Sequence, residues 1–321
     1  MGAVSSVVRA AQGSGGRKRP AGAGRPPRPA GRLAALAAIG VMASLLTAVR
    51  TGAGGYGENP AGGWIDAHFL RARVDPAAAR LEVIDTLTIR HRPGVPATRP
   101  FPLLLSADLR IDRVERVAGD PIRARDESFK PRDFWTDPPY EELEGYERAR
   151  SIALELEGAA GTWPESMRVV LSYGGTVYDS LRPPRVAYAR GFETTSGLID
   201  PRGAFLGGAT FWIPTRPDER FTYRCEIVTP SNWQSVSQGG LIRTDTRDGL
   251  RASVWDSPQP MEEIYLIAGP YVTRQEKHGD VDVMTYTYQD TGEEICKRYI
   301  DGTKRYIDLY ENLIGRYPFS K

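Results

Sequence analysis

Three stretches near the C-terminus decide the fold: EEIYLIAGPY at residues 262–271, TGEEICKRYI at 291–300 and ENLIGRYPFSK at 311–321. In the first stretch an unbroken apolar run over 264–268 is ended by Gly269 and Pro270. Such a run predicts a short strand that is buried on both faces. The other two stretches lie at the two ends of a helical pattern.

This pattern predicts an amphipathic helix. Thr291 and Glu294 have the spacing of a capping box, in which each side chain pairs with an amide of the first turn. One stripe is apolar and the opposite stripe is charged. The apolar stripe contains Cys296, Ile300, Thr303, Ile307, Tyr310 and Ile314, and the charged stripe contains Lys297, Asp301, Lys304, Asp308 and Glu311. Gly315 is placed to end the helix in a left-handed turn, and Pro318 cannot continue it.

The order of these segments resembles the start of the catalytic domain in the zinc aminopeptidase family of aminopeptidase N and leukotriene hydrolase. The matching segments are 265–271, the helix, and Tyr-Pro-Phe-Ser-Lys at 317–321. The segments 197–199, 203–206 and 212–214 also resemble the N-terminal-domain signature of a bacterial branch of that family. The resemblance covers roughly residues 64–321.

The resemblance implies a saddle-shaped N-terminal β domain followed by the first strands and helix of an α+β, thermolysin-like domain. It also implies a peptide substrate and a zinc ion in the full-length parent. Zinc peptidases of this kind bind the metal through a His-Glu-x-x-His helix and a further carboxylate. We expect that helix beyond Lys321, so this chain would be an N-terminal fragment without catalytic or metal-binding residues of its own.

Residues 1–57 differ in composition from the rest of the chain. They contain 8 Lys and Arg but no Asp or Glu, and residues 33–49 carry no charge. As a helix the latter segment would be about 25 Å long, against a hydrocarbon core of roughly 30 Å. A basic region before an apolar segment is typical of a cleaved secretory signal or an uncleaved membrane anchor, and an organellar transit peptide is a further alternative. We favour the anchor, with the globular part tethered or released outside the cytoplasm.

The remaining residues are acidic overall. The whole chain has a formal net charge of +2, but without its first 57 residues it has 34 Lys and Arg against 40 Asp and Glu. Nucleic-acid-binding domains need a basic face to neutralise phosphates. The composition therefore argues against a nucleic acid partner.

Alternating apolar and polar residues predict strands through most of residues 58–262. Clear examples are 81–90, 152–157, 167–173 and 221–228. Half-buried strands of this kind favour a mainly β domain, an antiparallel sandwich, with the start of the catalytic domain at 263–321.

The residues with metal-binding or nucleophilic side chains do not form a site. The three histidines, His68, His91 and His278, lack partners at zinc-ligand spacing, and we expect them to be solvated in strands or turns. Cys225 and Cys296 each lie on an apolar face and are expected to be core residues, although a disulfide between them stays open for an exported protein.

Two residues are candidates for binding a peptide substrate. Many members of the family hold the substrate amine with an acidic or amide residue of the β domain. No Glu stands at the matching place here, so Asp200 is a substitute by proximity and Glu193 lies further away. A β-turn role is the alternative for Asp200, which precedes Pro201.

Two other functions stay open. A non-catalytic β-sandwich could bind or scaffold a partner with the same fold. A secreted sandwich could instead bind carbohydrate through exposed Trp135 and Trp163. The polar, aromatic segment 120–150 is either an exposed insertion or a set of aromatics over a substrate entrance.

Overall fold

The computed structural model describes residues 61–140, 143, 145–158, 161–182 and 194–321. The expected membrane segment 33–49 and the candidate Glu193 lie outside these residues. Within the described part of the chain, no helix is long and apolar enough to cross a membrane.

The largest element is a seven-stranded sheet in the order β12-β13-β10-β1-β2-β7-β4. Its strands are β1 Gly63–Asp75, β2 Arg80–His91, β4 Leu109–Arg116, β7 Ser166–Thr176, β10 Phe221–Pro230, β12 Gly240–Arg247 and β13 Leu250–Met261. All neighbours pair antiparallel except β1 and β10, which are parallel. The predicted strands are confirmed, but alternation cannot reveal strand direction, and the parallel pair was not expected.

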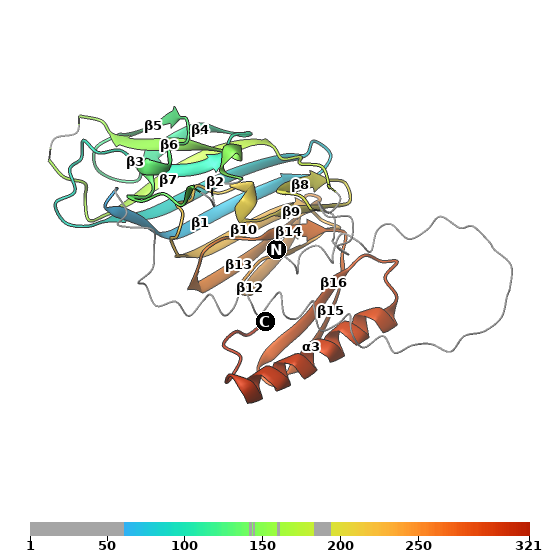
Figure 1. Cartoon of the computed structure of the whole chain (residues 1–321). Helices are drawn as coiled ribbons and strands as arrows, with labels where there is room; N and C mark the ends of the chain where they lie inside the picture. Colours follow the sequence, from blue (N-terminus) through green and yellow to red (C-terminus); the bar gives the residue numbers. More distant parts are fainter. Residues whose placement is uncertain (1–60, 141–142, 144, 159–160, 183–193) are drawn as a thin grey trace.

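Two smaller sheets pack against the seven-stranded sheet to complete the sandwich (Figure 1). One has the order β3-β6-β5 and the other, called the small sheet below, has the order β11-β14-β9-β8. Their strands are β3 Phe101–Ser106, β5 Ile122–Glu127, β6 Ala149–Leu156, β8 Gly197–Asp200, β9 Gly203–Leu206, β11 Gln234–Val236 and β14 Leu266–Gly269. Three short 3₁₀ turns, η3 Pro131–Asp133, η5 Tyr146–Arg148 and η6 Gly208–Thr210, connect strands.

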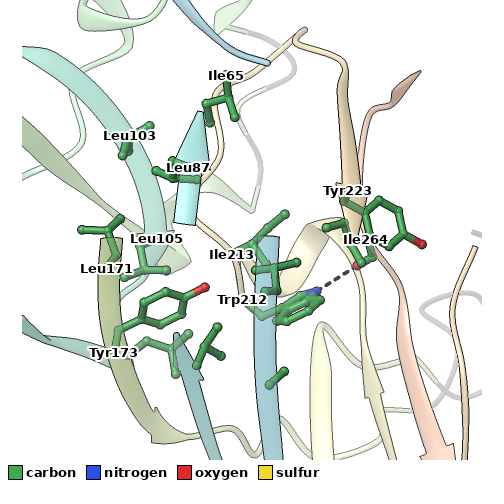
Figure 2. Packing of buried hydrophobic residues seen from close by; sticks show 14 of the residues in the cluster. Ile65, Leu87, Leu103, Leu105, Leu171, Tyr173, Trp212, Ile213, Tyr223 and Ile264 are labelled. Carbon is green, nitrogen blue, oxygen red and sulfur yellow. Dashed lines mark hydrogen bonds between the residues drawn. The ribbon is translucent and has the colours of Figure 1, made fainter. Parts of the chain in front are cut away.

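One hydrophobic core fills the space between the sheets. In β2 the side chains of Leu81, Val83, Leu87 and Ile89 are buried, with Asp85 and His91 on the same face, while the intervening residues, Ile84 among them, lie on the other face. Figure 2 shows Trp212 in this core, where its indole N–H donates to the carbonyl oxygen of Ile264 over 2.8 Å. Ile264 thus joins the segment that precedes β14 to the sandwich.

The final elements form a separate layer beside the sandwich (Figure 1). The hairpin of β15 (Val272–His278) and β16 (Val281–Thr287) packs against α3 (Glu293–Leu313). The small sheet links the two layers, because β14 hydrogen-bonds to β9 and β11 before the chain enters β15. The division of the chain at residues 262 and 263 stays a prediction.

The predicted helix is present, but two details of it were wrong. It begins one residue after Gly292, and no side chain caps its first turn, so the capping box of Thr291 and Glu294 does not form. Of the expected apolar stripe, Cys296 and Ile300 are buried, while Thr303 and Ile314 are exposed. Gly315 has a φ of +129° just after the helix, as its position predicted.

The aromatic residues of segment 120–150 are largely inside the protein. Phe134 and Trp135 are buried with Leu104 and Phe211 in a second cluster, and Trp135 Nε1 donates to Asp218 Oδ2 over 2.7 Å. The expectation of an exposed insertion was therefore wrong for this part. Trp163 is also buried. Neither Trp135 nor Trp163 presents an exposed ring face on which a sugar could stack. The carbohydrate-binding hypothesis, which required such exposed rings, is therefore not supported.

Candidate functional site

The outer face of the small sheet carries an apolar row. In its register Phe205 of β9 lies opposite Ile267 of β14, and Ile267 lies opposite Val236 of β11. These three side chains are half-buried, whereas alternate residues such as Leu206 and Ala268 point into the core. Period-two alternation thus places apolar groups on both faces of this sheet. Only one of the two faces is filled by the sandwich core.

At one end of this row lie an aromatic ring and a carboxylate. The ring of Tyr265 stacks on Phe205 with 6.2 Å between centroids. Glu263 Oε2 accepts the backbone N–H of Gly208 over 2.6 Å. A Cβ at Gly208 would lie 2.5 Å from that oxygen, and one at Gly207 would lie 2.9 Å from the Tyr265 ring. The two glycines are therefore needed for this close approach.

The sequence did not reveal Glu263 as part of a site. Glu262 and Glu263 form an acidic pair that suggests a solvated surface. In the structure they diverge: Glu262 is exposed and pairs with Arg220, while Glu263 turns toward η6. The Gly207-Gly208 pair is the signal that could have indicated a close contact.

Asp200 lies at the other end of β9, at the turn after β8. Its Oδ1 accepts the backbone N–H groups of Arg202 and Gly203 over 2.8 and 3.1 Å, and its Oδ2 pairs with the Arg202 guanidinium over 2.8 Å. Both carboxylate oxygens thus hold the turn. Asp200 contacts Gly203 at the start of β9 and Glu263 contacts Gly208 beyond its end, so the two carboxylates lie at opposite ends of this strand. A substrate-binding role for Asp200 or Glu193 stays a prediction.

The C-terminal segment, residues 316–321, lies between β16 and the sandwich and forms hydrogen bonds to both. Asp282 donates its backbone N–H to the carbonyl oxygen of Ser320 over 2.8 Å. The β15–β16 register pairs Asp282 with Lys277, so this bond joins the C-terminal segment, which is not itself a strand, to the two-stranded β15–β16 sheet.

Lys321 connects this segment to the sandwich. Its Nζ donates to the carbonyl oxygen of Ser237 and lies 4.1 Å from the centroid of the Trp255 ring. Burial lowers the pKa of Lys321 to about 8. Ser237 Oγ in turn donates to the carbonyl oxygen of Tyr265 over 2.7 Å. The C-terminal segment and the end of the small sheet that carries Glu263 are therefore joined through Ser237.

The histidines are placed differently from the expectation. His68 is buried, with Nδ1 2.8 Å from Asp85 Oδ2, and desolvation raises the pKa of Asp85. His91 is buried against Trp163, with ring centroids 4.8 Å apart. Solvated strand positions were therefore wrong for both, although His278 does lie at the hairpin turn beside Asp308.

The described residues do not fit a zinc ion. No group of three His, Cys, Asp or Glu side chains that could hold a metal occurs among them. Asp85 and His68 form an isolated buried pair, and zinc needs at least three protein ligands. The free thiols Cys225 and Cys296 are buried in separate places, one in the sandwich and one beneath α3. Both are core residues, as the sequence predicted.

Comparisons with known proteins support the fold. No family model and no curated protein matches the sequence. A mutant of the M1 zinc metallopeptidase from Deinococcus radiodurans with a bound Tyr-Ser-Ala substrate is similar in structure, at a TM-score of 0.53 and 18% identity. The similarity covers 82% of this chain and 56% of that chain.

Further solved structures give the same result. The M1 zinc metallopeptidase from the same organism matches at a TM-score of 0.52 and 16% identity, over 82% of this chain and 55% of that one. A two-domain M1 zinc metallopeptidase mutant bound to L-tryptophan matches at a TM-score of 0.52 and 18% identity, over 82% of this chain and 56% of that one. The chain thus spans a little over half the length of these proteins. The resemblance inferred from the motifs is confirmed for the fold.

Proposed function

We propose that this chain is the N-terminal part of a zinc metallopeptidase of the aminopeptidase type, whose zinc site is supplied by residues that follow Lys321. The observation that carries the proposal is the hydrogen bond from Asp282 to Ser320, which holds the C-terminal segment against β16 of the two-stranded β15–β16 sheet. In the sequence, Tyr317-Pro318-Phe319-Ser320-Lys321 is the segment that resembles the approach to the catalytic edge strand. The hydrogen bond to Ser320 supports the proposal because it involves a residue of this motif.

A peptide binds well at such an edge. Main-chain N–H and C=O groups on an unpaired strand form hydrogen bonds with any extended peptide, so affinity does not depend on one side chain. In this structure the C-terminal segment lies next to the small sheet, because Lys321 contacts Ser237 and Ser237 contacts Tyr265. The apolar row and the Glu263 carboxylate are then available to contact side chains or the amine of the peptide. No group of three His, Cys, Asp or Glu side chains that could hold a metal occurs among the described residues.

We also propose that the globular part lies outside the cytoplasm, tethered by or released from residues 33–49. The support is compositional: an acid-free basic segment precedes 17 uncharged residues. With the globular part outside the cytoplasm, residues 33–49 would contact the membrane in a tethered peptidase and would be removed from a released one.

Reading the genomic frame past Lys321 tests the proposal without any protein. We expect a His-Glu-x-x-His motif on a helix roughly 40 to 60 residues further on, followed by a Glu ligand on the next helix. A stop codon just after Lys321, or a continuation without the two histidines, would leave a non-catalytic β-sandwich binding protein as the better account.

A further inference from the structure

Strand β12 forms one edge of the seven-stranded sheet (Figure 1). In the described part of the chain it pairs with β13 alone. Every residue of 241–247 is exposed, so no described element covers this edge. A strand edge of this length offers a row of unpaired main-chain groups to another strand.

The turn between β12 and β13 determines which main-chain groups are free. Arg247 pairs with Leu250 across the two-residue turn 248–249, in which both residues have a positive φ. The pair that closes such a turn is hydrogen-bonded, and hydrogen-bonded pairs alternate along an antiparallel ladder. The main-chain groups of every second residue from Arg247 backwards therefore point toward β13, and those of Thr244 and Thr246 point out of the sheet.

One face of β12 carries charges of alternating sign. Arg243, Asp245 and Arg247 are exposed and lie on the same face, because side chains alternate along a strand with a period of two. Arg243 lies 3.8 Å from Glu226 of β10. Among the described residues, Asp245 and Arg247 have no ion-pair partner. These charges are therefore available to a strand that pairs with the β12 edge.

The charges at the opposite edge of the sheet are arranged differently. In β4 they neutralise one another within the strand, since Arg110 lies 3.1 Å from Asp112 and Arg113 lies 2.5 Å from Glu115. The charges of β12 have the same spacing of two residues, but the described part of the chain shows no such pair among them. Strand β12 thus keeps charges that a second strand could neutralise, whereas β4 does not.

The order of the charges in β12 is self-complementary about Thr244. When two copies of β12 pair antiparallel with Thr244 opposite Thr244, Arg243 of each copy lies opposite Asp245 of the other. The free main-chain groups then form the hydrogen-bonded pairs, and Thr246 lies opposite Ile242, which is 61% exposed. Arg243 and Asp245 occupy the pair without hydrogen bonds, where opposing Cα atoms are only about 4.5 Å apart.

Other registers that pair the free main-chain groups are less favourable. With Thr244 opposite Thr246, Asp245 would face Asp245 and Arg243 would face Arg247, and like charges directly opposite each other are destabilising. A register centred on Thr246 is compatible with the charges but pairs only the end of β12 next to the turn. The longest compatible register is therefore the one centred on Thr244.

We infer that β12 is an interface between two copies of this protein, which pair antiparallel about Thr244 and join their seven-stranded sheets into one continuous sheet. Any extended strand could satisfy the free main-chain groups. A second copy also supplies Arg243 and Asp245 in reversed order, so that both charge pairs are matched at once. The inference goes beyond the proposed peptidase function and does not depend on it.

Disulfide cross-linking in the full chain tests this pairing. Thr244→Cys places the two new thiols opposite each other at the two-fold axis, with Cα atoms about 5.5 Å apart, which suits a disulfide. Thr246→Cys is the matched control, because it lies on the same exposed face of the same strand but its two thiols would be about 14 Å apart, four residues along the strand. Under mild oxidation we expect at least about tenfold more linked dimer from Thr244→Cys than from Thr246→Cys. The native Cys225 and Cys296 are buried and should not cross-link.

A charge exchange in the Thr244→Cys chain tests the ion pairs. Arg243→Asp places a carboxylate opposite Asp245 on both sides of the axis and should lower the yield of linked dimer by about tenfold. Adding Asp245→Arg makes the opposing charges complementary again and should restore the yield. A local effect of Arg243→Asp, such as the loss of the contact with Glu226, would not be repaired by the second substitution.

Equal yields from Thr244→Cys and Thr246→Cys would overturn the inference, as would a charge exchange that fails to restore the dimer. Cross-linking of Thr246→Cys alone would reject the register in favour of pairing centred on Thr246. A Thr244→Cys chain that stays monomeric would show that a second copy does not occupy this edge.

Discussion

Arg216 Nε lies 2.8 Å from Glu219 Oε1 inside the sandwich, where the side chains are 2% and 11% exposed. The pair links three separate parts of the fold. Arg216 Nη1 donates to the carbonyl oxygen of Pro102 over 2.6 Å, and Glu219 Oε2 accepts the backbone N–H of Ile65 over 2.9 Å. Two buried charges are tolerated here because each is paired and hydrogen-bonded.

Removing one partner of this pair should be strongly destabilising. Arg216→Met leaves the Glu219 carboxylate buried without its cation, and we expect a loss of about 3–5 kcal/mol in the free energy of unfolding. Chemical denaturation measures it. Arg224→Met is the control, because Arg224 pairs with Asp256 at the surface and should cost at most about 1 kcal/mol. Equal losses for the two variants would contradict the buried-pair account.

Acid should destabilise the sandwich through His91. Burial lowers the pKa of His91 from its ordinary value of 6.5 to about 4. The unfolded chain therefore binds a proton that the folded chain does not, so this contribution is complete above pH 6.5 and is lost as the pH falls toward 4. The loss amounts to up to about 3 kcal/mol.

His91→Phe tests this contribution, because it keeps a ring against Trp163 but cannot titrate. Denaturation curves at pH 7 and pH 4.5 should show a smaller loss of stability on acidification for the variant than for the parent chain. Indistinguishable pH dependences would mean that His91 is not the group responsible.

The close contact between Gly208 and Glu263 should not accept a methyl group. Gly208→Ala places a Cβ 2.5 Å from Glu263 Oε2, which must displace the carboxylate, and we expect a loss of about 1–3 kcal/mol. Gly240→Ala is the matched control, because nothing lies within 4 Å of its Cβ position and its effect should stay within about 0.5 kcal/mol. A neutral Gly208→Ala variant would show that the Glu263 position is adaptable.

The proposed export can be tested with a reporter. A fusion after Glu58 to an enzyme that is active only in the cytoplasm should give no signal in the native host, because residues 33–49 would carry the reporter across the membrane. Deleting 33–49 should restore the signal. Strong activity of the undeleted fusion would reject an exported globular part.

Local pattern predicted much of the fold. The alternation at 81–90 and 221–228 identified β2 and β10, since one face of each strand packs on the core. The same alternation holds a signal that was missed. His68 is in phase with Leu70 and Ala72, and His91 with Leu87 and Ile89, so their burial follows from position once the strand is accepted. The polar character of histidine suggested solvent-exposed positions for both residues. The period-two alternation of their strands instead places both on the buried face.

Other features could not be read from one chain segment. Helix α3 has two apolar stripes, and only the position of the β15–β16 sheet decides which of them is buried. The parallel pairing of β1 with β10 joins residues more than a hundred positions apart. Glu263 is distinguished from Glu262 only by its contact with Gly208. In each case tertiary contacts, and not local periodicity, carry the information.

Metal analysis of two purified proteins tests the central claim most directly. The chain from Asn59 to Lys321 should retain no stoichiometric zinc after dialysis and should not hydrolyse aminoacyl amides, because no metal-binding group occurs among its described residues. The product of the whole reading frame should retain about one zinc per chain, and a chelator should remove the metal and the activity together. Zinc-free full-length protein, or tightly held equimolar zinc on the shorter chain, would contradict the claim that this chain is the N-terminal part of a zinc metallopeptidase with its metal site further on.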